Sequence, residues 1–183
     1  MNVTYLNSHE MKKFQNIHKL YLPKRKRAFG KNGVSSKSSN IENKTNIDYI
    51  IEKARFVLDL FEKKDYDSSK YYVEFQHRNC GFEKKCRRTF NWHNDNYNFG
   101  GYPVFTVIFY IRKDLGIKGG GLEYIIDSTK NIHSINEGNI LCFDGRITHR
   151  PEICSGIGCR DSIVVFIKKN TKHNWNDLLH IIF

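Results

Sequence analysis

Prolines and long apolar runs are scarce in this sequence. The chain contains 3 prolines among 183 residues. Its longest apolar run, Val104 to Ile111, is far shorter than the roughly 20 residues that cross a bilayer. The first residues, MNVTYLNSHEMKKF, contain no apolar segment followed by a small-residue cleavage site, which a secretory signal peptide requires. We therefore expect an intracellular protein, cytoplasmic or nuclear, with no membrane partner.

A regular cysteine pattern is also missing. The chain has 5 cysteines, and this odd number suits reduced thiols better than a disulfide framework. Their shortest spacings, C-x5-C and C-x4-C, differ from the C-x2-C spacing that is usual in structural zinc sites. We expect reduced thiols, and a zinc-stabilised protein that binds nucleic acid stays open as an alternative.

Acidic residues are nearly absent from the first 45 residues. This segment has 10 Lys and Arg against Glu10 and Glu42, so it carries 10 − 2 = +8 of the total charge of +11. It includes Lys24-Arg25-Lys26-Arg27 and then GKNGVSSKSSN, a polar stretch that cannot bury enough apolar surface to fold alone. We predict a basic, flexible arm at 1–45 that binds nucleic acid, serves as a nuclear address or only aids solubility. Residues 46–183 would form a single domain.

The rest of the chain predicts one helix followed by strands. Apolar residues recur at helical spacing from Ile47 to Phe61, which predicts an amphipathic helix over 46–64. From about residue 70 to 170, short β-branched and aromatic runs alternate with Gly, Asn and Asp. Helices do not alternate with these runs, so we predict a mainly β fold with antiparallel sheets, rolled into a sandwich or small barrel beside the N-terminal helix.

Three side chains along these strands could hold a metal ion. His93 and Asp95 stand two positions apart, which places both on one face of a strand. His149 follows a predicted strand and a glycine turn. Two histidines and one carboxylate form the facial triad of non-haem Fe(II) oxygenases. Each part alone is weak, because H-x-D can be a surface pair and His149 can be a strand-end histidine bonded to the backbone.

A guanidinium group opens the last apolar strand. Arg160 and Ser162 share one face by the two-residue period of a strand. A positive charge at the start of a buried strand needs an anionic partner. A dicarboxylate cosubstrate or an acidic side chain of the protein would both meet that need.

Taken in order, these parts resemble the signature of the Fe(II)/2-oxoglutarate-dependent dioxygenases, which have a double-stranded β-helix (jelly-roll) fold. The signature H-x-D, then His, then R-x-S reads here His93-Asn94-Asp95, His149 and Arg160-Asp161-Ser162. The segments YPVFTVIFYIRKD, GGGLEYI and EGNILCFDGRITHRP also resemble family segments, so the resemblance covers about residues 70–170. The ending G-x-R-x-S-I-V-V-F is similar to both the prolyl-hydroxylase branch and the base-J/ten-eleven-translocation branch.

The resemblance implies a role for each part. His93, Asp95 and His149 would be the catalytic Fe(II) ligands, with O2 as a further substrate. The cosubstrate 2-oxoglutarate would be held by Arg160 and Tyr110, with Ser162 and Thr106 on the same strand faces. Residues expected to line the substrate entrance are Trp92, Phe99 and Arg146.

The implied reaction is hydroxylation of a C–H bond in a macromolecular substrate. The basic segment 1–45 favours a nucleic-acid base as that substrate. A prolyl-type protein hydroxylase and a non-catalytic jelly-roll binding module remain alternatives.

Overall fold

The computed structural model describes residues 1–21, 33–37, 44–79, 91–95 and 102–170. Within these ranges two helices and a series of strands follow one another along the chain. Their bounds are β1 Asn2–Tyr5, α1 Ser8–Tyr21, β2 Gly33–Lys37, α2 Lys44–Leu60, β3 Tyr66–Asn79, β4 Val104–Lys113, β5 Ile117–Gly119, β6 Leu122–Ile126, β7 Thr129–His133, β8 Asn139–Asp144, β9 His149–Pro151, β10 Cys154–Gly156 and β11 Cys159–Lys169.

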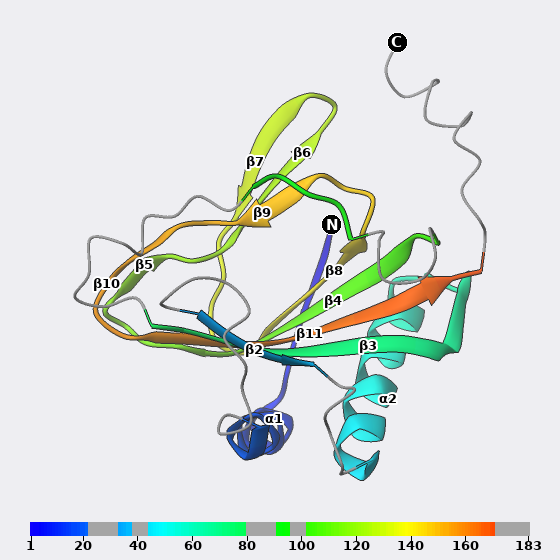
Figure 1. The fold of residues 1–183 in the computed structure, drawn as a ribbon, viewed down its shortest axis with the longest axis horizontal. Helices are drawn as coiled ribbons and strands as arrows, with labels where there is room; N and C mark the ends of the chain where they lie inside the picture. The colour runs from blue at the N-terminus through cyan, green and yellow to red at the C-terminus, as the bar shows by residue number, and fades with distance from the viewer. Residues whose placement is uncertain (22–32, 38–43, 80–90, 96–101, 171–183) are drawn as a thin grey trace.

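The strands form a large sheet that faces smaller ones. The large sheet has the order β1-β8-β4-β11-β3-β2, and a three-stranded sheet has the order β7-β6-β9. Strands β5 and β10 pair with each other at one end of the molecule (Figure 1). The pairings within the described residues are antiparallel. The predicted double-stranded β-helix fold is confirmed.

Both helices lie on the outer side of the large sheet, opposite the three-stranded sheet (Figure 1). The apolar stripe predicted for the second helix is buried as expected, and it contains Ile47, Ile50, Ile51, Ala54, Val57 and Leu58. The helix itself is shorter at its C-terminal end than the predicted range 46–64. It starts at Lys44 and ends at Leu60, and Glu62 then adopts a left-handed φ of 56°.

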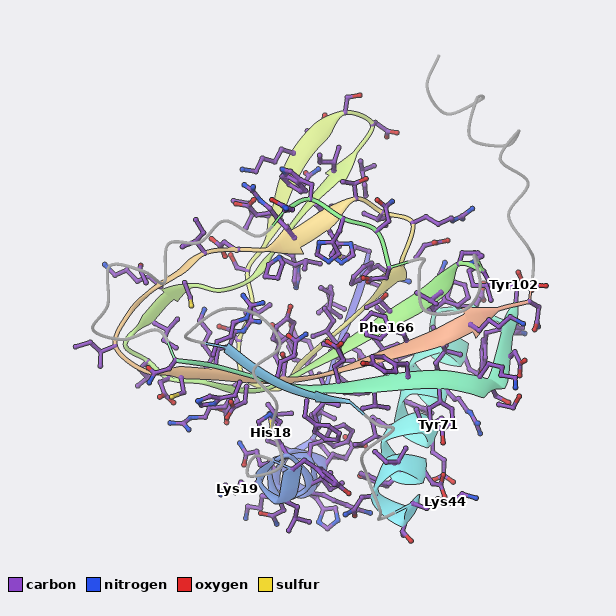
Figure 2. All side chains as sticks on the ribbon, in the orientation of Figure 1. His18, Lys19, Lys44, Tyr71, Tyr102 and Phe166 are labelled. Carbon is purple, nitrogen blue, oxygen red and sulfur yellow. The ribbon has the colours of Figure 1, made fainter. Side chains whose placement is uncertain are left out.

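Strand β4 shows how the large sheet separates two cores. Phe105, Val107, Phe109 and Ile111 pack in the core beneath the helices. Val104, Ile108 and Tyr110 belong to a second core between the sheets. Because successive side chains point to opposite faces, a strand covered on both sides reads as a continuous apolar run. Figure 2 shows the same division, with Phe166 between the sheets and Tyr71 toward the helices.

The prediction of a flexible arm at 1–45 is wrong for residues 1–21 and 33–37. Strand β1 pairs with β8 at one edge of the large sheet, and β2 pairs with β3 at the other edge. Helix α1 buries Phe14, whose ring centroid lies 4.7 Å from that of Phe109. Phe14, Ile17 and Tyr21 of this helix are buried in the core beneath the sheet, and burial of apolar surface favours the ordered segment. The basic run Lys24–Arg27 lies outside the described residues.

A sequence signal for α1 was present. The backbone N–H of Asn7 donates to Glu10 at 2.9 Å, and the N–H of Glu10 donates back to the Asn7 side chain at 2.9 Å. This reciprocal pair is a capping box, and it is legible in the letters NSHE. The high net charge of residues 1–45 favoured a flexible arm over a helix at this position.

The cysteines differ from the expectation of reduced thiols. Cys142 and Cys159 are free thiols, whereas Cys154 is disulfide-bonded. Burial raises the pKa of the Cys142 thiol to about 12. Within the described residues, neither helix is long and apolar enough to span a membrane.

Candidate functional site

The fold brings His93, Asp95 and His149 together, although they come from segments more than fifty positions apart. His93 and His149 form an antiparallel bridge, with backbone N···O distances of 3.0 and 2.9 Å. The Asp95 N–H donates to the Gly145 carbonyl at 2.8 Å. One ligand atom from each of the three side chains lies within 4.8 Å of the others. The short strand that carries His149 therefore anchors the segment that carries the other two residues.

Hydrogen bonds hold both imidazole rings with the same nitrogen toward Asp95. Nδ1 of His93 lies 2.9 Å from the Asn91 carbonyl, and Nδ1 of His149 lies 2.7 Å from the Ile147 carbonyl. Because a carbonyl only accepts, each Nδ1 donates its hydrogen to that carbonyl, and this bond turns each Nε2 toward Asp95. The Nε2 atoms lie 3.9 Å (His93) and 3.3 Å (His149) from the Asp95 carboxylate. These three groups are oriented to share a cation.

The electrostatics of His149 fit a position beside a carboxylate. Burial lowers the pKa of this histidine. The hydrogen bond and the negative charge of Asp95 together raise the pKa by more than burial lowers it, so the net shift is upward. Asp95 and His149 are 4% exposed, whereas His93 is half-buried. The cluster is therefore open to solvent on the His93 side.

Two neighbours fix Asp95, one at its carboxylate and one at its backbone. Thr106 on β4 donates its hydroxyl hydrogen to Asp95 Oδ2 at 2.8 Å, in a buried contact. Gly145 leaves room for the chain to pass closely, since a Cβ atom there would lie 3.0 Å from Asp95 Cβ and 3.0 Å from the Val104 carbonyl oxygen. Thr106 therefore contacts the candidate metal ligand itself. Asn94 points elsewhere, because its side-chain amide donates to the Arg146 carbonyl.

A second polar cluster lies on the inner face of the large sheet. Arg160 and Tyr110 are 3% and 2% exposed, and the guanidinium carbon lies 5.6 Å from the ring centroid. Ser162 stands opposite Tyr110 in the β4–β11 register. Arg160 donates through Nη1 to the Gly120 carbonyl, but its buried Nε has no hydrogen-bond partner. A buried guanidinium N–H without an acceptor suits a carboxylate ligand.

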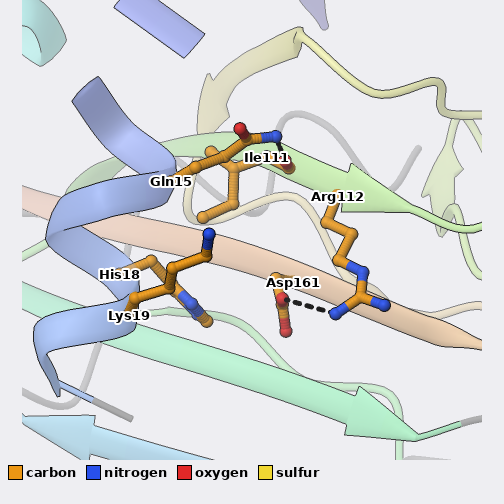
Figure 3. Close-up of a pocket in the computed structure, with 6 residues that line it drawn as sticks. All are labelled: Gln15, His18, Lys19, Ile111, Arg112 and Asp161. Carbon is orange, nitrogen blue, oxygen red and sulfur yellow. Dashed lines mark hydrogen bonds and ion pairs between the residues drawn. The ribbon is translucent and has the colours of Figure 1, made fainter. Parts of the chain in front are cut away.

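Asp161, between Arg160 and Ser162, points to the other face of the sheet, as the two-residue period predicts. Its Oδ1 lies 2.5 Å from Nδ1 of His77. It lines a pocket under helix α1 with His18 and Arg112 (Figure 3). The adjacent acidic side chain therefore does not supply the partner that Arg160 needs.

The structure places two of the three residues that the sequence predicted at a substrate entrance. Trp92 is half-buried next to His93, and the Arg150 guanidinium lies 4.4 Å from its ring. Arg146 forms an ion pair with Asp144 at 2.6 Å. Phe99 lies outside the described residues.

Two polar residues of the inner face were not among the site residues predicted from the sequence. Gln76 lies opposite Ser162, and Arg78 lies opposite Arg160, in the β3–β11 register. Their two-residue spacing along YYVEFQHRN placed them on one strand face. That spacing could not show which other strand they would meet.

Comparisons with known proteins show likeness in structure. No protein-family model matches the chain, and no curated protein matches it in sequence. A prolyl-4-hydroxylase from Pseudomonas putida superposes with a TM-score of 0.66 at 10% identity, over 93% of this chain and 92% of that one. A 2OG-Fe(II) oxygenase-family oxidoreductase from Burkholderia pseudomallei gives a TM-score of 0.66 at 11% identity, covering 91% and 81%.

A third structure is a prolyl hydroxylase from Trichoplax adhaerens in complex with a peptide fragment of hypoxia inducible factor. It superposes with a TM-score of 0.58 at 15% identity, over 92% of this chain and 83% of that one. Each of the three matches covers more than nine tenths of this chain. The protein therefore shares the double-stranded β-helix fold of these solved oxygenases.

Proposed function

We propose that this protein is an Fe(II)- and 2-oxoglutarate-dependent dioxygenase that hydroxylates a C–H bond of a macromolecular substrate. One observation carries the proposal. Two groups of polar side chains lie in the space between the sheets. One is the cluster of two histidines and one carboxylate, and the other contains a buried arginine with an unsatisfied N–H. Strand β4 links the two clusters. Its Thr106 contacts Asp95 of the first cluster, and its Tyr110, on the same strand face, contacts Arg160 of the second.

The residues of the first cluster fit Fe(II). His93, Asp95 and His149 would be its protein ligands, since imidazole and carboxylate in a facial set leave three positions free for other ligands. The bound metal would supply the activation of O2, coupled to oxidative decarboxylation of 2-oxoglutarate to succinate and CO2. The backbone carbonyls at Nδ1 hold both rings with Nε2 directed toward Asp95.

The second cluster fits the far carboxylate of 2-oxoglutarate. Arg160 would pair with it, and Tyr110 would limit its position. The surrounding inner core includes Leu141, Phe143 and Phe166, which are buried and apolar. This wall excludes water and strengthens the ion pair, because charge attraction grows as the local dielectric falls.

For the substrate we propose a polypeptide. Several solved structures with this fold are prolyl hydroxylases. The sequence-based preference for nucleic acid depended on a free arm, and residues 1–21 and 33–37 belong to the sheet and its covering helix. A nucleic-acid base is the second candidate, which the run Lys24–Arg27 supports through its capacity to contact phosphates.

The test is succinate release from 2-oxoglutarate by protein reconstituted with Fe(II) under anaerobic conditions and then exposed to O2. Proline-rich peptides, single-stranded DNA and RNA are added in parallel, with His149→Ala as the inactive control. Stimulation by peptides alone supports the polypeptide assignment, and stimulation by nucleic acid alone overturns it. Metal binding with no succinate under any condition would instead identify a non-catalytic binding module.

A further inference from the structure

A small cavity lies between helix α1 and the outer face of the large sheet (Figure 3). Its volume is about 220 Å³. This exceeds the roughly 30 Å³ that one water occupies, and it is below the roughly 300–1,000 Å³ of pockets for drug-sized ligands. A ligand with only a few non-hydrogen atoms would therefore fit. The lining residues are Gln15, His18 and Lys19 of α1, Ile111 and Arg112 of β4, and Asp161 of β11.

Two hydrogen bonds fix the walls of this cavity. The Gln15 side-chain amide donates to the Ile111 carbonyl at 2.9 Å. Nε2 of His18, which is 1% exposed, lies 2.9 Å from the Gln76 carbonyl. These contacts tie one face of α1 to strands β4 and β3. The cavity is therefore formed before a ligand enters, which lowers the cost of binding.

Asp161 offers a buried carboxylate oxygen to the cavity. This residue is 6% exposed, and its Oδ1 lies 2.5 Å from Nδ1 of His77. Its second oxygen, Oδ2, accepts no hydrogen bond from the described residues. The Nη1 atom of Arg112 lies 4.0 Å from Oδ2, which is longer than a hydrogen bond. A buried carboxylate with an open acceptor position favours a cationic donor from a ligand.

Two positive charges line the same cavity. Lys19 is exposed and makes no ion pair or hydrogen bond with another described residue. Arg112 pairs through Nε and Nη2 with Asp114, at 2.7 and 2.9 Å, which leaves Nη1 on the side of Asp161. A purely anionic ligand would meet the Asp161 carboxylate, and a purely cationic one would meet Lys19 and Arg112. Because like charges repel more strongly where solvent is partly excluded, a ligand with both charges fits best.

We propose that this cavity binds a small zwitterion, namely an α-amino acid with a short aliphatic side chain. The ammonium group of the ligand would donate to Oδ2 of Asp161. Its carboxylate would pair with Lys19 and Nη1 of Arg112, and its side chain would pack on Ile111. The site is separate from the candidate metal cluster, because Asp161 and Arg160 point to opposite faces of β11. Binding here needs neither Fe(II) nor 2-oxoglutarate.

Three ligands of similar shape test the two charges. L-valine carries both, isovalerate lacks the ammonium group, and isobutylamine lacks the carboxylate. Nuclear magnetic resonance titration of the isotope-labelled full chain gives each Kd, and the amides that shift locate the site. L-valine should bind with a Kd of about 1 mM, and about tenfold more tightly than either analogue, as for one charge-assisted contact. The largest shifts should come from α1 and from residues next to Asp161.

Two substitutions separate the ends of the ligand. Lys19→Gln removes the partner of the carboxylate at an exposed position, so the protein should stay folded. It should weaken L-valine about tenfold and leave isobutylamine unchanged. Asp161→Asn should instead weaken L-valine and isobutylamine and leave isovalerate unchanged. Lys12→Gln is the matched control, because Lys12 is also exposed on α1 but does not line the cavity.

Absence of saturable L-valine binding, or equal affinity for L-valine and isobutylamine, overturns the proposal. Equal effects of Lys19→Gln and Lys12→Gln on L-valine binding overturn it as well, and this comparison stands even if Asp161→Asn does not fold. Shifts centred on His149 in place of Asp161 would show that the ligand enters the space between the sheets, and they also count against this cavity.

Discussion

The Thr106 hydroxyl donates a buried hydrogen bond of 2.8 Å to Oδ2 of Asp95. This contact joins central strand β4 to the candidate metal ligand, on the opposite carboxylate oxygen from the one nearest His93. Asp95 is thereby held on two sides, by its backbone bond to Gly145 and by Thr106. A carboxylate fixed in this way keeps its remaining lone pairs directed at the two imidazole rings.

Thr106→Val should weaken metal binding while the protein stays folded. Valine has nearly the same shape but cannot donate, so Asp95 loses its orienting partner, and outer-shell changes of this kind cost about 10- to 100-fold in metal affinity. Titration with Fe(II) under anaerobic conditions measures the effect. Thr129→Val, on exposed strand β7, is the control. Equal metal affinities in the two variants would remove Thr106 from the metal site.

Asp95→Ala should abolish bound metal and 2-oxoglutarate turnover together. Two imidazoles remain, and they bind Fe(II) far more weakly without the anionic ligand. Metal analysis after reconstitution should drop from about one ion per chain to near none, by the ligand count of a facial triad. Retention of zinc in this variant would favour the zinc-stabilised alternative.

Arg160→Gln should mainly raise the KM for 2-oxoglutarate. The substitution removes a charge-assisted contact to the cosubstrate and leaves the metal ligands in place, so an effect of about 10- to 100-fold follows from roughly 1.5–3 kcal/mol. Arg160→Lys keeps the charge and should recover part of the affinity. If KM does not change, the guanidinium has a purely structural partner.

Asp161→Asn should lower stability near neutral pH, and the difference should disappear in acid. Burial raises the pKa of Asp161. The hydrogen bond from His77 and the nearby positive charge lower the pKa by more than burial raises it, so it lies below its ordinary value of 3.8. A depressed carboxyl pKa contributes stability above the unfolded pKa, and this contribution is lost as the pH falls through the folded pKa. Urea unfolding at neutral pH should show a loss of about 1–3 kcal/mol.

The pH series for this pair needs a second variant. If the His77 contact causes the effect, Asp161→Asn should cost little in a His77→Gln background. A stability difference that persists below the folded pKa of Asp161 would show that the charge of this residue is not its source.

Several parts of the protein could be read from the sequence because they depend on short-range periods. The two-residue period of a strand places His93 with Asp95 and turns Asp161 away from Arg160 and Ser162. The 3.6-residue period of a helix marked the buried stripe of α2. These relationships need no knowledge of distant segments. The order of the metal-binding motifs added the fold class through resemblance.

Only the tertiary structure decided which segments meet. Thr106 lies against Asp95, and Arg78 lies opposite Arg160, because particular strands pair in a particular register. A shift of one residue would turn each of these side chains to the other face. Residues 1–21 belong to the fold for a similar reason, since β1 covers an edge and α1 covers apolar surface, both formed by distant strands. Composition reports the charge of a segment, but burial depends on the surface that the rest of the chain offers to it.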